Sequence, residues 1–156
     1  MQLTTALLAL LPATLTLASP APRSGFERVA KRQSASTLSY DPLYSVAGSS
    51  TNTVACSGVL AQTYPTFGSL PGFPLIGGAP TIADGSSPSC GACYQVSWTD
   101  QTGATSSINV IGIDVATQGF NVATEAMDQL TGGRAIEFGR VDVTWTEVAR
   151  EVCYGA

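Results

Sequence analysis

The hydrophobic and polar positions along the chain predict mainly β structure. Short stretches rich in aromatic and β-branched residues, some with apolar and polar positions in alternation, predict strands. These stretches are residues 35–40, 54–56, 94–98, 106–113 and 139–144. The sequence DQTG at 100–103 is typical of a hairpin turn between the third and fourth of them. Val110 and Ile111 are apolar at consecutive positions, which predicts that the fourth strand is buried on both faces.

One longer helix is predicted after the fourth strand. Apolar residues recur at helical spacing from Val122 to Leu130, and Asn121 before them is a good N-cap. Gly132 and Gly133 then end the helix. Residues 111–121 (IGIDVATQGFN) therefore read as a strand, a turn containing glycine, and a helix start.

The remaining segments favour short helices and ordered loops. Residues 58–64 have the length of one or two helical turns. Residues 67–80 (FGSLPGFPLIGGAP) contain too much Gly and Pro for long regular structure, but their apolar side chains predict a packed loop. Because short strands from the whole chain need partners without exposed edges, we expect a small closed barrel, mainly β with short helices.

The first 32 residues are expected to be absent from the mature protein. An apolar stretch near the start, followed by small residues, predicts a signal peptide over residues 1–19 and is too short to span a bilayer. A propeptide over residues 20–32 ends in the dibasic pair Lys31-Arg32, which is typical of a processing site. The alternative is a solvated charge pair in a disordered arm. The mature domain would occupy residues 33–156, where no stretch is long enough to cross a membrane.

The charge of this predicted domain limits its partners. The whole chain has seven basic and eleven acidic residues, and three arginines and ten acids follow residue 32, so the net charge is 3 − 10 = −7. The domain contains neither lysine nor histidine. Nucleic acid and anionic membranes are therefore poor partners, whereas neutral ligands remain open.

The absence of histidine also limits the chemistry. A Ser-His-Asp triad, a Cys-His pair and a zinc site built on imidazole are all excluded, and no metal or other cofactor is expected. Carboxylates remain as general acids or bases, and Asp114 at the end of an apolar strand is the foremost candidate. Asp114 either caps the turn that follows or does functional work. Glycoside hydrolysis commonly needs two placed carboxylates, and Asp41, Asp84 and Asp142 are candidate partners without a matching motif.

Four cysteines follow residue 32: Cys56, Cys90, Cys93 and Cys153. An even number in a small secreted domain predicts two disulfides. A Cys90–Cys93 bond would close only a local loop, and the other two pairings remain open. A thioredoxin-like redox site is disfavoured because no strand-then-helix frame surrounds the cysteines, and a four-thiolate zinc site is disfavoured in an oxidising compartment.

Several motifs together resemble the cerato-platanin family of small proteins secreted by filamentous fungi. They are SYDPLY, GSLPGFPLIGGAP, CGACY, INVIGID followed by GFN, and VDVTW, and the likeness spans residues 36–153. The resemblance implies a six-stranded double-psi β-barrel, related to the first domain of expansins. It also implies the pairings Cys56–Cys90 and Cys93–Cys153.

The resemblance further implies function. Members are secreted or held in the fungal cell wall, bind chitin and N-acetylglucosamine oligomers, and loosen cellulose without hydrolysing it. They self-assemble at interfaces, many elicit plant defence through host recognition components, and some relatives are allergens. The loop LPGFPLIGG could present apolar residues for self-assembly, unless Phe73, Leu75 and Ile76 belong to the core.

The likeness also points to individual residues. Asp114 matches the aspartate that the family uses in carbohydrate binding, and that position corresponds to the catalytic acid of lytic barrel relatives. The other characteristic positions near the same surface are Tyr40, Asp41, Gly119, Phe120 and Asn121. Four of these five residues have a structural alternative: packing for Tyr40 and Phe120, a turn for Asp41 and a helix cap for Asn121. The chain departs from many members at Tyr94, where they have Trp, and from some at Val115, where they have His. We therefore expect sugar binding, not hydrolysis.

Overall fold

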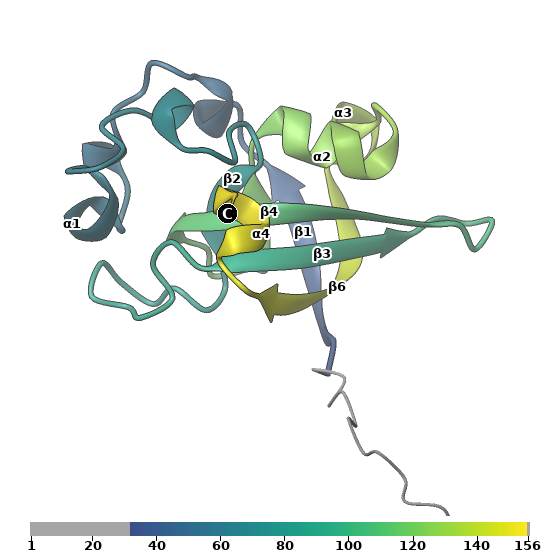
Figure 1. The fold of residues 1–156 in the computed structure, drawn as a ribbon. Helices are drawn as coiled ribbons and strands as arrows, with labels where there is room; N and C mark the ends of the chain where they lie inside the picture. Colours follow the sequence, from purple (N-terminus) through teal and green to yellow (C-terminus); the bar gives the residue numbers. More distant parts are fainter. Residues whose placement is uncertain (1–31, 156) are drawn as a thin grey trace, which may run out of the picture. The chain divides into compact units, whose positions relative to one another are not determined.

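The computed structural model describes residues 32–155. The predicted signal peptide (1–19) and all but the last residue of the predicted propeptide (20–32) lie outside the described residues. The remainder forms a closed barrel with the strand order β1-β5-β2-β4-β3-β6 (Figure 1). Its strands are β1 Ser34–Tyr40, β2 Ile76–Ala79, β3 Cys93–Thr99, β4 Thr105–Val115, β5 Phe120–Val122 and β6 Arg140–Val148.

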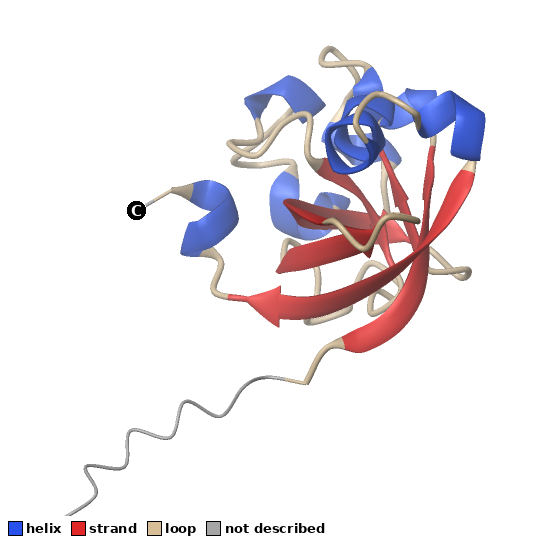
Figure 2. Ribbon diagram, turned by 90° about the vertical axis from the view of Figure 1, so that its right-hand side faces the viewer, coloured by secondary structure: helices blue, strands red, loops and turns tan. Residues whose placement is uncertain are grey.

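Short helices lie outside this barrel (Figure 2). They are the 3-10 turns η1 Pro42–Ser45, η2 Thr51–Thr53 and η3 Phe67–Ser69, and the α-helices α1 Ser57–Leu60, α2 Thr124–Thr131, α3 Ala135–Phe138 and α4 Glu151–Tyr154. None of the helices in the described range is both long and apolar enough to cross a membrane.

The barrel is mixed in direction. β1 pairs in parallel with β5, and β2 in parallel with β4, whereas the other four neighbouring pairs are antiparallel. Closure removes the free strand edges on which other chains could add. The expected six-stranded closed barrel is confirmed.

Aromatic rings fill the barrel interior. Tyr94, Phe120 and Trp145 form a triangle of edge-to-face contacts with ring centroids 5.5–5.6 Å apart. This geometry suits the aromatic quadrupole, and such pairs contribute roughly 0.5–1.5 kcal/mol each beyond their buried area. Tyr94 and Phe120 are wholly buried, so both belong to the core.

The segment 42–70 packs onto the barrel and belongs to the same apolar core. It contributes the buried residues Tyr44, Val54, Leu60, Phe67 and Leu70. The disulfides are Cys56–Cys90 and Cys93–Cys153, as the resemblance implied. The first ties the start of α1 to the turn before β3, and the second ties β3 to α4.

Three local predictions were wrong or incomplete. Residues 54–56 form no strand, because Cys56 leads directly into α1 and its amide makes a single hydrogen bond to the Ile113 carbonyl. Within the Gly- and Pro-rich loop lies the strand β2, fully buried. The helix begins at Thr124, not after Asn121, because Phe120–Val122 pairs with β1 and β2 as β5.

The Gly- and Pro-rich loop does not present its apolar residues to solvent. Ile76 is wholly buried, and Phe73 and Leu75 are partly buried against the core. Of the two readings of this loop, the structure supports the core packing.

Candidate functional site

The centre of the candidate site is the glycine pair of β2. Gly78 pairs with Asp114 of β4 on one side and with Asn121 of β5 on the other. Two interstrand spacings separate these partners, about 10 Å. A β-carbon on the neighbouring Gly77 would overlap the Asn121 carbonyl, so only glycine allows β5 to lie this close. The barrel thus holds Asp114 and Asn121 on either side of a strand without side chains at this point.

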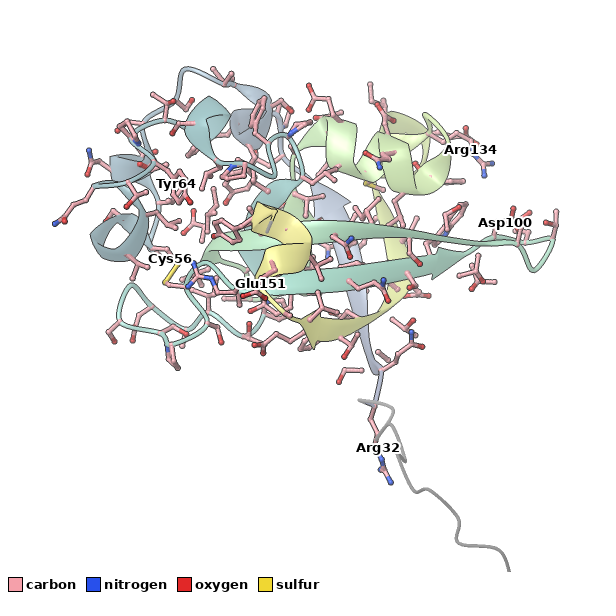
Figure 3. The ribbon with its side chains drawn as sticks, in the orientation of Figure 1. Arg32, Cys56, Tyr64, Asp100, Arg134 and Glu151 are labelled. Atoms are coloured by element: carbon pink, nitrogen blue, oxygen red, sulfur yellow. A yellow bond between two sulfur atoms is a disulfide. The ribbon has the colours of Figure 1, made fainter. Side chains whose placement is uncertain are left out.

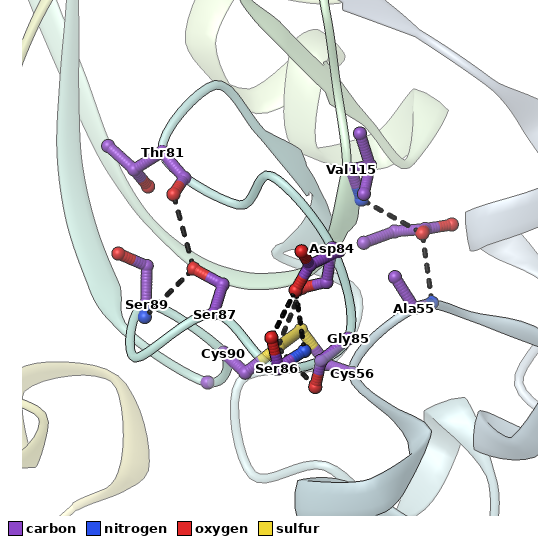
Figure 4. Close-up of a disulfide and its surroundings, with 12 residues drawn as sticks. Ala55, Cys56, Thr81, Asp84, Gly85, Ser86, Ser87, Ser89, Cys90 and Val115 are labelled. Atoms are coloured by element: carbon purple, nitrogen blue, oxygen red, sulfur yellow. Dashed lines mark hydrogen bonds between the residues drawn. A yellow bond between two sulfur atoms is a disulfide. The ribbon is translucent and has the colours of Figure 1, made fainter.

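The Asp114 carboxylate is held by three donors. Its Oδ1 accepts hydrogen bonds from the amides of Ala55 (3.0 Å) and Val115 (2.8 Å), both labelled in Figure 4. Its Oδ2 accepts one from the Tyr44 hydroxyl (3.0 Å). An ionised carboxylate has about four lone-pair sites. Because the group is only partly buried, one acceptor site remains for a ligand, on a carboxylate whose orientation is already set.

Tyr44 is the buried member of this arrangement, with 5% of its surface exposed. Burial raises the pKa of its hydroxyl well above the ordinary value, and the Asp114 charge, the hydrogen bond to Asp114 and the Asp41 charge add to the shift. Tyr44 therefore remains a hydrogen-bond donor to Asp114 throughout the physiological pH range.

Replacing Tyr44 by Phe should lower the free energy of unfolding by about 1.5–3 kcal/mol at neutral pH, because one hydrogen bond to a charged group is lost. The free energy of unfolding of the variant should also fall less than that of wild type as the pH rises above about 10. Above about pH 10 a tyrosine in the unfolded chain ionises, whereas Tyr44 in the folded protein keeps its proton. The unfolded state then binds fewer protons, so stability falls as pH rises, by up to about 1.4 kcal/mol per pH unit for this residue.

Urea unfolding of wild type and Tyr44→Phe at several pH values, from neutral to about one unit above the ordinary tyrosine pKa, measures this difference. The slope with pH should be shallower in the variant, and not zero, because the pKa values of Tyr94 and Tyr154 are also raised by burial. Parallel slopes for the two proteins would contradict the assigned role of Tyr44.

A pocket of about 290 Å³ adjoins Asp114 through its neighbour Val115. It is lined by Ser39, Val115, Ala116, Thr117, Gln118, Gly119, Asn121 and Arg140. The Asn121 side-chain oxygen accepts a hydrogen bond from the Ser39 hydroxyl at 3.0 Å. The side-chain nitrogen (Nδ2) of Asn121 has no hydrogen-bond partner within residues 32–155 and can donate to a ligand.

Arg140 organises one wall of this pocket. Its Nη1 donates to the Gln118 carbonyl at 2.6 Å and to the Thr37 hydroxyl at 2.7 Å, and its Nη2 donates to Ser39 at 3.1 Å. Gly119 follows with a φ of +85°, and a β-carbon there would overlap the Thr37 carbonyl. Sequence reasoning missed Arg140, although it is one of only three arginines after residue 32.

The structure separates the remaining predicted site residues. Phe120 is wholly buried, so it can act only by supporting β5 from inside the barrel. Tyr40 packs partly buried against the core. Asp41 accepts a hydrogen bond from the Leu43 amide at 2.9 Å and caps η1. Asn121 is no helix cap, because that position is occupied by Ala123. Of the predicted residues, Gly119 and Asn121 line the pocket, and Asp114 adjoins it through Val115.

The chemistry of the site is that of hydrogen bonding. None of the pocket-lining residues is a carboxylate, and no other described carboxylate shares a hydrogen bond with Asp114. Asp84 instead binds the Ser86 amide and hydroxyl in an exposed turn. Residues 32–155 contain no group of three or more potential metal ligands.

Comparison with known proteins is consistent across sequence and structure. Residues 36–155 match the family model described as Cerato-platanin. The chain is 49% identical over 140 residues to Allergen Asp f 15 of Aspergillus fumigatus, covering 88% of this chain and 86% of that protein.

Solved structures of cerato-platanins are also similar to this chain. The crystal structure of cerato-platanin 2 from M. perniciosa is similar with a TM-score of 0.74 and 51% identity, over 79% of this chain and 100% of that one. The solution structure of the fungal elicitor Cerato-Platanin is similar with a TM-score of 0.64 and 45% identity, over 76% of this chain and 96% of that one.

Proposed function

Because the chain belongs to the cerato-platanin family, we propose that it is a secreted, non-hydrolytic carbohydrate-binding protein of the fungal surface. Its ligands are chitin and N-acetylglucosamine oligomers, and it loosens cellulose by binding it. Its biological role is to be recognised by a host, as an elicitor of plant defence. Similarity to a protein described as a fungal elicitor and to one named an allergen supports this last step.

The observation that carries the proposal is the preset Asp114 carboxylate with the Asn121 side-chain amide across the glycine pair of β2. A sugar offers hydroxyl donors to the carboxylate, and an acetamido carbonyl accepts from an amide N–H. Both protein groups are held before a ligand arrives, Asp114 by three hydrogen bonds and Asn121 by Ser39. Such preorganisation reduces the entropy lost on binding.

The same geometry favours binding over hydrolysis. Glycosidases place two carboxyl groups about 5–5.5 Å apart when they retain configuration and about 6.5–9.5 Å apart when they invert it. The pocket here is lined by no carboxylate, and the groups that hydrogen-bond to Asp114 are the Ala55 and Val115 amides and the Tyr44 hydroxyl.

Incubation of the purified protein with insoluble chitin and with cellulose tests the proposal. We expect the protein to be depleted from solution by the polysaccharide, with no reducing ends or soluble fragments beyond those of a protein-free blank. The Asp84→Asn variant is the matched control and should bind as wild type does, because this exposed carboxylate accepts its hydrogen bonds from Ser86 within its own turn. Fragment release that rises with protein concentration and vanishes in Asp114→Asn would replace this function with a lytic enzyme.

A further inference from the structure

A second pocket lies at the opposite end of β4. It has a volume of about 350 Å³ and is lined by Trp98, Thr99, Asp100, Gln101, Thr102, Arg134, Phe138, Val141 and Asp142. Asp100 and Arg134 are labelled at this hairpin end of the molecule in Figure 3. Trp98 pairs with Ser106, which stands eight residues before Asp114 on β4. At about 3.3 Å per residue this pairing lies roughly 26 Å from Asp114 along β4. On β6, however, Val141 of the second pocket directly follows Arg140 of the first. The two pockets share no lining residue.

Arg134 is preorganised in this pocket. Its guanidinium carbon lies 4.4 Å from the ring centroid of Phe138 and 5.7 Å from that of Trp98, within the range of cation–π contacts. Its Nε donates to the Thr131 carbonyl at 3.3 Å. Its two terminal amino groups have no hydrogen-bond partner in the described part of the chain. The stacked guanidinium thus offers four N–H donors in a fixed plane.

Hydrogen-bond acceptors also line this second pocket. Asp100 accepts the hydrogen bonds of the hairpin turn through Oδ1 alone, from the Thr102 amide and hydroxyl and from the Ala104 amide. The hydrogen bond from the Thr102 side chain is the main cause that lowers the pKa of this carboxyl, so Asp100 is ionised with Oδ2 unengaged. Asp142 is a second exposed carboxylate at the rim. Hydrogen-bond acceptors therefore lie opposite the Arg134 donors.

These features together select the class of ligand. Two carboxylates against one guanidinium disfavour an anion. The free Arg134 donors require a ligand with acceptors, whereas Asp100 and Asp142 require one with donors. Trp98 and Phe138 supply apolar surface that can cover the C–H face of a ring. A neutral sugar carries hydroxyl donors, hydroxyl acceptors and C–H faces together, and the pocket volume lies in the usual range of about 300–1,000 Å³ for small-molecule sites.

We infer that this pocket is a second saccharide site that takes neutral oligosaccharides and shares no lining residue with the pocket beside Asp114. A protein with two saccharide sites can contact polysaccharide at two places at once. Each contact is weak alone, but two contacts on one wall raise the effective affinity through their high local concentration.

Nuclear magnetic resonance titration of the isotope-labelled protein tests each site separately. The probes are tetra-N-acetylchitotetraose and cellotetraose, with tetragalacturonate as the anionic control. We expect the neutral probes to shift the Trp98 indole N–H, the Arg134 Nε–H and the amides of residues 100–103, both in wild type and in Asp114→Ala. Tetragalacturonate should leave these signals in place.

Two conservative variants make the test specific. Asp142→Asn alters an exposed rim group, and Arg134→Gln removes the stacked cation, and each should weaken binding at this pocket roughly tenfold, the loss expected for one hydrogen bond to a charged group. The amide shifts of residues 116–119 should be unchanged in both.

The outcomes separate this inference from the proposed function. Absence of shifts at Trp98 and Arg134 at millimolar probe overturns the second site, whatever residues 116–119 do. Shifts at Trp98 without shifts at 116–119 support the second site and contradict the Asp114 site. Shifts at Trp98 that persist with equal affinity in both Arg134→Gln and Asp142→Asn also overturn the inference, because its donors and acceptors would then be unused.

Discussion

Reduction of both disulfides is expected to lower the melting temperature of the protein by about 20 °C or more. The Cys56–Cys90 bond spans 34 residues and the Cys93–Cys153 bond spans 60. In the chain-entropy model each closure stabilises the folded state by about 4 kcal/mol, and the longer loop adds only about 0.5 kcal/mol over the shorter. The sum approaches the total stability of a typical domain, about 5–15 kcal/mol.

Thermal unfolding with and without reductant measures this effect, provided that mass spectrometry verifies complete reduction. The double variants Cys56→Ala/Cys90→Ala and Cys93→Ala/Cys153→Ala should each lose about half of the stabilisation. A melting temperature that stays within a few degrees after verified reduction would refute the role of the disulfides as the main constraint on the unfolded chain.

Local sequence patterns predicted those parts of the fold that depend on neighbours in the chain. The hairpin from Tyr94 to Ile113 is an example, because its turn residues and β-branched strands agree with each other. β2 was missed for the opposite reason. Gly77 and Gly78 have poor strand propensity, and their presence is explained only by the close approach of β5 and β4, which involves residues more than 30 positions away.

Asn121 illustrates a tertiary effect that overrides a local signal. Its position before an apolar helical pattern is typical of an N-cap, but strand pairing with Ser39 and Gly78 places it in β5. The helix therefore starts three residues later, at Thr124. Local propensity could not reveal this, because both pairing partners come from distant parts of the chain.

The candidate site was predictable in part. Asp114 was recognised from its place at a strand end and from the family likeness, but its donor Tyr44 lies 70 residues away. Arg140 and the Trp98 pocket were missed since each depends on β6 lying beside β1 and β3. Composition did mark these residues indirectly, because Arg134 and Arg140 are two of three cations in an otherwise acidic domain.

Replacing Asp114 by Ala is expected to abolish saccharide binding at the pocket of residues 116–119 while the barrel remains folded. The change removes the acceptor of the Ala55 and Val115 amides and of the buried Tyr44 hydroxyl. A buried donor left without a hydrogen-bond partner lowers the free energy of unfolding by about 1–3 kcal/mol, so the variant should be less stable as well. Asp114→Asn keeps an acceptor for the amides, and should retain more stability while losing the charge that binds sugar hydroxyls.

Folding and binding are separated by matched variants. Tyr44→Phe removes one support of the carboxylate but leaves the carboxylate itself, so it should weaken binding far less than Asp114→Ala. Asp84→Asn neutralises a carboxylate that is fully exposed in a turn and should bind as wild type does. Barrel integrity in each variant is monitored through the indole signal of Trp145, which lies in the interior aromatic triangle.

The most direct measurement is a titration of wild type and Asp114→Ala with tetra-N-acetylchitotetraose, followed at the amides of residues 116–119. We expect saturable shifts at these amides in wild type and at least a roughly tenfold loss of affinity in the folded variant, as for one charged hydrogen bond. An equal affinity at these amides in a folded Asp114→Ala protein would contradict the assignment of Asp114 as the saccharide acceptor.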